Sequence, residues 1–229
     1  MQLVFIHGSG NAGKVWTCQS RHFPGSIAVD LPGHPQGDLI DSIPGMAAWL
    51  KRYVDERNLS ELVLIGHSIG GGIALQYALD YPEDVRALIS IGSGGRLRVH
   101  PDTIAYMEHA IADPDSIAPL IDSFWQKVTG DTARELKADS LALGPGVFLN
   151  DFKACDTFDV MARLGEISVP TLAIVGTEDV MTPVKYAQFL VDTIQNARIE
   201  IIEGGTHYVF AEYPEEVNVA IDAFLEELA

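Results

Sequence analysis

A serine lies at the centre of a glycine-rich turn, because residues 66–70 read Gly-His-Ser-Ile-Gly. The turn follows the apolar run Leu62–Ile65 and precedes a stretch with helical spacing, so it connects a strand to a helix. In such a connection the serine is held in a strained backbone conformation, and the flanking positions have no room for a Cβ atom. The pattern G-x-S-x-G in this context therefore indicates that Ser68 is an exposed nucleophile.

A serine hydroxyl is a weak nucleophile until a base takes its proton. His207 is the histidine placed for that task, because it directly follows the predicted strand Arg198–Ile202 and its Gly-rich turn. The imidazole in turn needs a buried carboxylate that fixes its tautomer and stabilises the imidazolium. Asp179 and its neighbour Glu178 both follow the predicted strand Thr171–Gly176, so either could supply that carboxylate.

The elements that must position these groups form an alternating pattern. Apolar runs without polar alternation are separated by helix-like stretches, which is typical of a parallel sheet buried on both faces. Because all the reacting groups follow strand ends, they can converge at one edge of the sheet. The expected strands are Gln2–His7, Ser26–Asp30, Leu62–Gly66, Ala87–Gly92, Thr171–Gly176 and Arg198–Ile202, and the expected helices among them are Pro44–Asn58, Ile69–Asp80, Thr182–Ile194 and Pro214–Leu228.

Residues 96–168 depart from this alternation, because their pattern is helical without a convincing strand. Ligands bind at the C-terminal edge of open α/β sheets, so a helical block inserted between two strands predicts a cap over that edge. The alternative is that the helices only extend the core. The predicted division is a core domain of residues 1–95 and 169–229 with a cap of residues 96–168. The expected cap helices are Pro101–Ala112, Ser116–Lys127, Asp131–Leu143 and Asn150–Leu164, with a break at the Gly-Pro-Gly of 144–146.

Nearly the whole chain resembles the α/β-hydrolase fold family. The resemblance rests on His-Gly-Ser-Gly at residues 7–10, Asp-Leu-Pro-Gly-His at 30–34, the serine turn at 66–70, the helical insertion, Gly-Thr-Glu-Asp at 176–179 and Gly-Thr-His at 205–207. The order serine, acid, histidine is also the order of that family. The implied fold is α/β, a mainly parallel sheet of about six strands flanked by helices, without the first two family strands and with a helical cap.

The resemblance also implies the roles of the residues. Ser68 is the expected nucleophile, His207 the base and Asp179 the orienting acid, since the family pattern Gly-x-x-Asp favours Asp179 over Glu178. The backbone N–H of Ile69 is expected to stabilise the oxyanion of the tetrahedral intermediate. The second donor is expected from Ser9, with Gly10 as the alternative.

The sequence also suggests roles for the loop histidines and for the residues of a substrate pocket. His7 and His67 lie inside motif turns and are expected to be structural. The loop at His34 departs from the Gly-His-Gly that the family usually has there, because Pro35 follows the histidine. Several apolar side chains could line an acyl pocket, although most would serve equally as core. The candidates are Trp16, Phe124, Trp125, Phe148, Phe158, Met181, Tyr208 and Val209.

The expected activity is that of a serine carboxylesterase acting on small to medium acyl chains through an acyl-enzyme, without metal or organic cofactor. The same triad could act on lactones, thioesters or the carbon–carbon bonds of diketones, because specificity lies in the cap and not in the fold. Ser68 argues against the dehalogenases and epoxide hydrolases of the family, which use aspartate there. A non-catalytic receptor would predict a decayed triad, and all three positions are intact.

Composition limits the partners. The 229 residues include 32 acidic and 15 basic side chains, a net charge of −17, which argues against nucleic acid or an anionic membrane as a partner. The partner that the resemblance implies is a small-molecule ester. The apolar run at the N-terminus is too short for a signal sequence, and two cysteines make no disulfide framework, so a cytoplasmic location is expected. An unpaired sheet edge predicts a homodimer or a protective loop.

Overall fold

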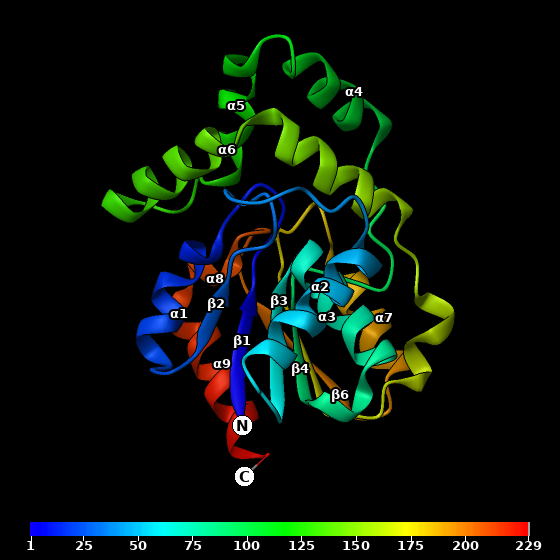
Figure 1. The fold of residues 1–229 in the computed structure, drawn as a ribbon. Helices are drawn as coiled ribbons and strands as arrows, with labels where there is room; N and C mark the ends of the chain where they lie inside the picture. Colours follow the sequence, from blue (N-terminus) through cyan, green and yellow to red (C-terminus); the bar gives the residue numbers. More distant parts are fainter. Residues whose placement is uncertain (229) are drawn as a thin grey trace.

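A computed structural model describes residues 1–228. Its centre is one sheet of six parallel strands in the order β2-β1-β3-β4-β5-β6 (Figure 1). The prediction of a parallel six-stranded sheet flanked by helices is confirmed. The strands are β1 (Gln2–Ile6), β2 (Ile27–Val29), β3 (Leu62–His67), β4 (Val85–Ile91), β5 (Thr171–Gly176) and β6 (Ala197–Ile202).

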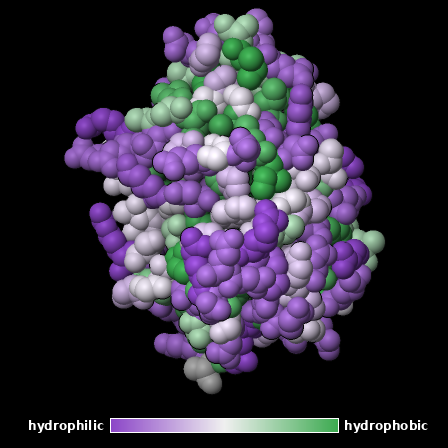
Figure 2. Space-filling view, in the orientation of Figure 1, coloured by the Kyte–Doolittle hydropathy of each residue, from purple (hydrophilic) through white to green (hydrophobic). Residues whose placement is uncertain are grey.

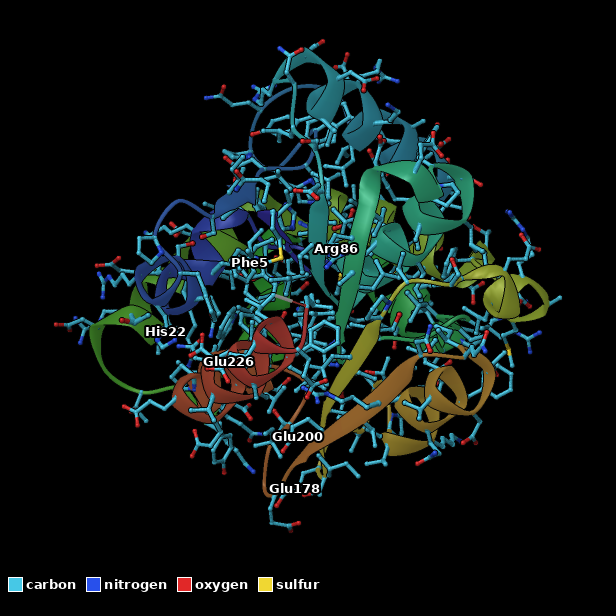
Figure 3. All side chains as sticks on the ribbon, turned by 90° about the horizontal axis from the view of Figure 1, so that it is seen from below. Phe5, His22, Arg86, Glu178, Glu200 and Glu226 are labelled. Carbon is cyan, nitrogen blue, oxygen red and sulfur yellow. The ribbon has the colours of Figure 1, made fainter. Side chains whose placement is uncertain are left out.

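The continuous apolar runs are explained by a core on each face of the sheet. Successive side chains of a strand point to opposite faces. Val4 therefore packs into one core and Phe5 into the other, and Leu64 and Ile65 of β3 divide in the same way. Figure 3 shows the labelled Phe5 inside the molecule. Every residue of β3 and of β5 is buried, as expected for central strands covered on both faces.

Two groups of helices cover the sheet (Figure 1). The core that includes Val4 is closed by helices that follow β2, β3 and β5, and the core that includes Phe5 by helices from the two ends of the chain. The first group is α2 (Ile43–Glu56), α3 (Ile69–Asp80) and α7 (Val184–Thr193), and the second is α1 (Thr17–His22), α8 (Val209–Glu212) and α9 (Pro214–Glu226). Short 3-10 helices span Gly13–Trp16, Pro82–Asp84, Pro114–Ile117 and Met161–Glu166.

The helical segment of residues 96–168 contains α4 (Pro101–Ala110), α5 (Ala118–Phe124) and α6 (Gly130–Thr157). These three helices lie together beyond the C-terminal ends of the strands (Figure 1). Apolar residues show between hydrophilic ones on the visible face of this segment in Figure 2. None of the helices within residues 1–228 is both long and apolar enough to cross a membrane.

One helix boundary was predicted correctly and another was not. The expected break is present, because Gly144 has φ 76° inside α6 and is followed by Pro145. The predicted continuation to Leu164 is wrong, since α6 ends at Thr157. There the chain turns to form an antiparallel bridge between Asp159 and Arg96, a tertiary contact that local sequence does not encode.

Candidate active site

The turn between β3 and α3 holds Ser68 at the C-terminal edge of the sheet. Ser68 has φ 55° and ψ −119°, a conformation that non-glycine residues rarely adopt. Its carbonyl oxygen accepts a hydrogen bond of 2.6 Å from the Ser93 hydroxyl. A Cβ atom at Gly66 would lie 2.2 Å from the Gly70 carbonyl oxygen, and one at Gly70 would lie 2.3 Å from the Ile6 carbonyl oxygen. Both glycines are thus required by close backbone approach.

Asp179 and His207 are joined by a hydrogen bond of 2.9 Å between Oδ2 and Nδ1. Asp179 follows β5, and its other oxygen accepts from the backbone N–H groups of Met181 and Thr182, each at 2.8 Å. The Thr182 hydroxyl donates to Oδ2 at 2.8 Å. The carboxylate is therefore oriented from two sides, and because Nδ1 of His207 is engaged, Nε2 is the nitrogen left for a proton acceptor.

Thr182 lies outside the helix that was predicted to begin with it. The expected helix Thr182–Ile194 is shorter in the structure, because α7 begins at Val184. The Thr182 hydroxyl instead contacts Asp179. Burial alone would raise the pKa of Asp179, but the imidazole of His207 and the hydrogen bonds from Thr182 outweigh burial and lower this pKa below its usual value. The carboxylate is thus ionised at neutral pH.

Ser68 and His207 line the same cavity, whose volume is about 340 Å³. Within residues 1–228 no direct hydrogen bond joins the Ser68 hydroxyl to the imidazole; such bonds are often loose without substrate and tighten in the complex. His67 connects the serine turn to the loop after β6, because its Nε2 donates to the His207 carbonyl oxygen at 2.9 Å. Burial and the nearby His207 hold the pKa of His67 well below its usual value, so this ring is neutral.

The loop after β1 contributes Ser9 to the lining of the cavity. His7 Nδ1 donates to the Gly8 carbonyl oxygen at 2.9 Å, and in a trans peptide the N–H points opposite to the carbonyl. The bond therefore turns the N–H of Ser9, a residue that lines the cavity, away from His7. Gly10, the alternative donor, is already engaged, since its N–H donates to Asp151 Oδ2 at 2.9 Å. Ser9 and Ile69 thus remain the candidate oxyanion donors.

Only part of the predicted pocket lining is found at the cavity. Met181 and Phe124 line it, together with residues that the sequence did not single out. The other candidates are packed in the core and absent from the lining. Trp16 packs against Phe5 and Phe210, and Trp125 packs against Tyr208. Tyr208 is itself buried, with its hydroxyl accepting a hydrogen bond from Asn11, so predicting Trp16, Trp125 and Tyr208 as substrate contacts was wrong. The remaining core residues among the candidates are Phe148, Phe158 and Val209.

The cavity lining combines the reacting groups with mostly apolar walls. The additional lining residues are Leu97, Arg98, Val99, His100, Thr103, Leu120, Phe152, Cys155, Val180, Thr182 and Tyr186. Within residues 1–228 no group of three or more His, Cys, Asp or Glu side chains is arranged to hold a metal ion. The chemistry that this arrangement allows is proton transfer from a serine to a histidine that a carboxylate orients.

A sheet of this topology, with a strained serine turn and an aspartate–histidine pair at its C-terminal edge, defines a class of hydrolytic enzymes. A profile of the alpha/beta hydrolase family matches residues 3–220. The chain belongs to the alpha/beta hydrolase family, as the resemblance predicted.

The individual relatives share less than a third of their aligned residues with this chain. The chain is 29% identical to a thermophilic esterase of known structure, with a TM-score of 0.82 over 99% of this chain and 90% of that one. It is 28% identical to protein ABHD8 of Homo sapiens over 97% of this chain, but spans only 54% of that protein. A 2-hydroxy-6-oxo-6-phenylhexa-2,4-dienoate hydrolase of Comamonas testosteroni is 26% identical, over 96% of this chain and 86% of the relative. The chain thus spans about half the length of the ABHD8 relatives.

Proposed function

We propose that this protein is a serine hydrolase that cleaves carboxylic esters of small to medium acyl chains. The observation that carries the proposal is the buried Asp179–His207 hydrogen bond beside a cavity that Ser68 also lines. The cavity volume of about 340 Å³ lies near the lower end of the range for small-molecule sites. Its walls are mostly apolar, which suits a short acyl chain.

The proposed reaction proceeds through an acyl-enzyme. His207 accepts the proton of the Ser68 hydroxyl at Nε2 while the serine oxygen attacks the ester carbonyl. The negative charge on the carbonyl oxygen is stabilised by the N–H groups of Ile69 and Ser9. The protonated imidazole, stabilised by Asp179, then gives its proton to the departing alcohol. Water, activated by the same imidazole, attacks the acyl-enzyme and releases the carboxylic acid.

The helical segment of residues 96–168 is proposed to act as the cap of this site. Leu120, Phe124 and Phe152 come from that segment and line the cavity. The size and shape of the acyl site therefore depend on the packing of α5 and α6. Lactones, thioesters and diketones would meet the same reacting groups, so a panel of substrates is needed to choose among them.

The proposal is tested with a panel of nitrophenyl esters of increasing chain length, together with a lactone and a diketone. We expect the short and medium esters to have the highest kcat/KM. Ser68→Ala is expected to lower kcat on the order of 10⁶-fold and to abolish labelling by a fluorophosphonate probe. Ser123→Ala is the matched control, because Ser123 is exposed and lies outside the cavity lining.

Two results would contradict the proposal. The first is folded wild-type protein that does not react with the probe at Ser68. The second is labelled protein that cleaves the diketone or the lactone far faster than any ester, which would retain the serine mechanism and replace the substrate class.

A further inference from the structure

A carboxylate of the helical segment reaches the loop that carries the proposed oxyanion donor. Asp151, on α6, is 1% exposed. Its Oδ2 lies 2.9 Å from the Gly10 nitrogen and 2.9 Å from His34 Nε2. One oxygen atom thus joins α6, the loop after β1 and the loop after β2, although these three segments are far apart in the sequence.

The contacts of His34 define its charge. Nε2 faces the Asp151 carboxylate, and Nδ1 lies 3.1 Å from the Pro32 carbonyl oxygen. Both partner atoms are hydrogen-bond acceptors, so the ring donates from both nitrogens and is an imidazolium. Burial alone would lower the pKa of His34, but the hydrogen bond and charge of Asp151 outweigh burial and raise it. The result is a buried ion pair with both side chains almost inaccessible to solvent.

His7 lies next to this pair and is neutral. Its ring is 4.9 Å from that of His34, and its Nε2 accepts a hydrogen bond of 3.1 Å from the backbone N–H of Leu31. Burial and the charge of His34 lower the pKa of His7 to about 3. Since Nε2 is an acceptor, the single ring proton is on Nδ1, where it bonds the Gly8 carbonyl oxygen.

The peptide units on both sides of the Ser9 Cα are therefore fixed by side chains. The Gly8 carbonyl is held by His7. In the following peptide the Ser9 carbonyl accepts from Asn11 Nδ2 at 2.9 Å, and the Gly10 N–H donates to Asp151. Gly10 has φ 61°, a conformation that glycine leaves easily when its contacts are lost. The ring of Phe148 packs against Gly10, and Asp151 supplies the hydrogen bond from outside this loop that holds the Gly10 N–H.

We propose that Asp151, with His34 as its counterion, is a positioning residue that fixes the loop of residues 8–10 so that the Ser9 N–H faces the oxyanion. This inference rests on the proposed function, because the oxyanion belongs to that reaction. The residue acts through the loop and does not touch the substrate, since neither Asp151 nor His34 lines the cavity. Loss of Asp151 should therefore destabilise the transition state and lower kcat, while binding of the substrate in the ground state changes little.

The main variant is Asp151→Ala. We expect kcat and the rate of fluorophosphonate labelling of Ser68 to fall about 10- to 100-fold, less than the loss of a whole oxyanion donor, while KM changes less than about twofold. Asp151→Asn keeps an acceptor oxygen at the same place and should recover most of both rates. Because Asp151→Ala leaves a lone buried cation that can prevent folding, the double variant Asp151→Ala/His34→Ala is measured beside it and should show the same loss.

Asn150→Ala is the matched control. Asn150 is the neighbouring residue of α6, and its Nδ2 donates to the Ile40 carbonyl oxygen at 2.9 Å, with a longer contact of 3.4 Å to Asp151 Oδ1. This variant removes another hydrogen bond between α6 and the core. It leaves both contacts of Asp151 Oδ2 in place. We expect a lower Tm for this variant with unchanged kcat and labelling rate, whereas a merely structural role of Asp151 would make the two variants behave alike.

Amide hydrogen exchange of residues 9–11 gives a readout that needs no substrate. Exchange should be faster in Asp151→Ala and in the double variant than in Asn150→Ala. Folded variants that label and exchange like the wild type would overturn the inference. If wild-type Ser68 labels but no ester is cleaved, the proposed substrate class fails, while the labelling and exchange rates still decide the role of Asp151.

Discussion

At the scale of single residues, the adjacent carboxylates of Asp179 and Glu178 have different environments. Asp179 is buried and accepts hydrogen bonds from His207, Met181 and Thr182. Glu178 is exposed and pairs with Lys127 Nζ at 2.7 Å. In Figure 3 the labelled Glu178 lies at the rim of the molecule. Only the first of the two can hold an imidazole in one tautomer.

We expect Asp179→Asn to lower kcat by about 10⁴-fold, because an amide leaves the imidazole in the wrong tautomer and removes the charge that stabilises the imidazolium. Glu178→Gln should change kcat less than about threefold, since it alters only an exposed ion pair. Ester hydrolysis and thermal unfolding of both variants provide the measurement. A larger loss for Glu178→Gln would show that the orienting acid was assigned to the wrong residue.

Residues in local motifs could be predicted from the sequence, and residues that act through tertiary contacts could not. Ser68, Asp179 and His207 each follow a strand end that the apolar pattern marks. Asp151 lies in the middle of a helix, where an aspartate usually faces solvent, and no local signal pairs it with His34. Most aromatic pocket candidates were wrong, although Phe124 does line the cavity. Core and pocket select the same residue types, as the buried Trp16 shows.

At the scale of elements, the position of α3 depends on backbone contact with β1. Gly70 is the point of contact, where an added Cβ atom would meet the Ile6 carbonyl oxygen. Such a clash can be relieved only by moving the helix that begins at the serine turn. The glycine at the kink of α6 is different, because a Cβ atom at Gly144 would meet no atom within 4 Å.

These two glycines provide a matched pair of substitutions. Gly144→Ala should cost only the strain of its backbone conformation (φ 76°, ψ 171°), about 1–3 kcal/mol of unfolding free energy. Gly70→Ala should cost more, about 3 kcal/mol or above, because helix and strand must separate, and it should lower activity as well. Urea unfolding at pH 7 measures both. Equal costs would mean that the turn adapts more readily than the backbone distances indicate.

The elements themselves were predictable to the extent that their signals are local. Apolar runs predicted the strands, although the edge strand β6 also contains Arg198 and Glu200, and the Gly-Pro pair predicted the kink in α6. The end of α6 was missed because it is determined by the pairing of Asp159 with Arg96 across the fold. The short helices α1 and α8 have too few residues for a periodic pattern.

At the scale of the whole molecule, buried histidines link stability to pH with opposite signs. His7 and His67 have lowered pKa values in the folded state. Their contribution to the free energy of unfolding is complete above the pKa of histidine in the unfolded chain, about 6.5. It is lost as the pH falls below that value, because the unfolded chain takes up protons that the folded protein does not bind. His34 has a raised pKa in the folded state. Its contribution to the free energy of unfolding is complete below the unfolded pKa of about 6.5 and is lost as the pH rises through the raised pKa of the folded state.

We therefore expect the free energy of unfolding to decrease below pH 6.5, by up to about 1.4 kcal/mol per pH unit for each neutral buried histidine. His67→Gln should be less stable than the wild type at pH 7 but lose less stability on going to pH 5. The comparison between the two proteins cancels the effect of the acidic surface. Parallel pH curves would show that His67 does not remain neutral in the folded protein.

The excess of acidic side chains has a consequence for the proposed reaction. The protein has a net charge of −17. A neutral ester can approach it without electrostatic repulsion. In the proposed reaction, hydrolysis turns that ester into an anion inside the cavity. The net negative charge of the molecule would then favour departure of the carboxylate product and oppose its return.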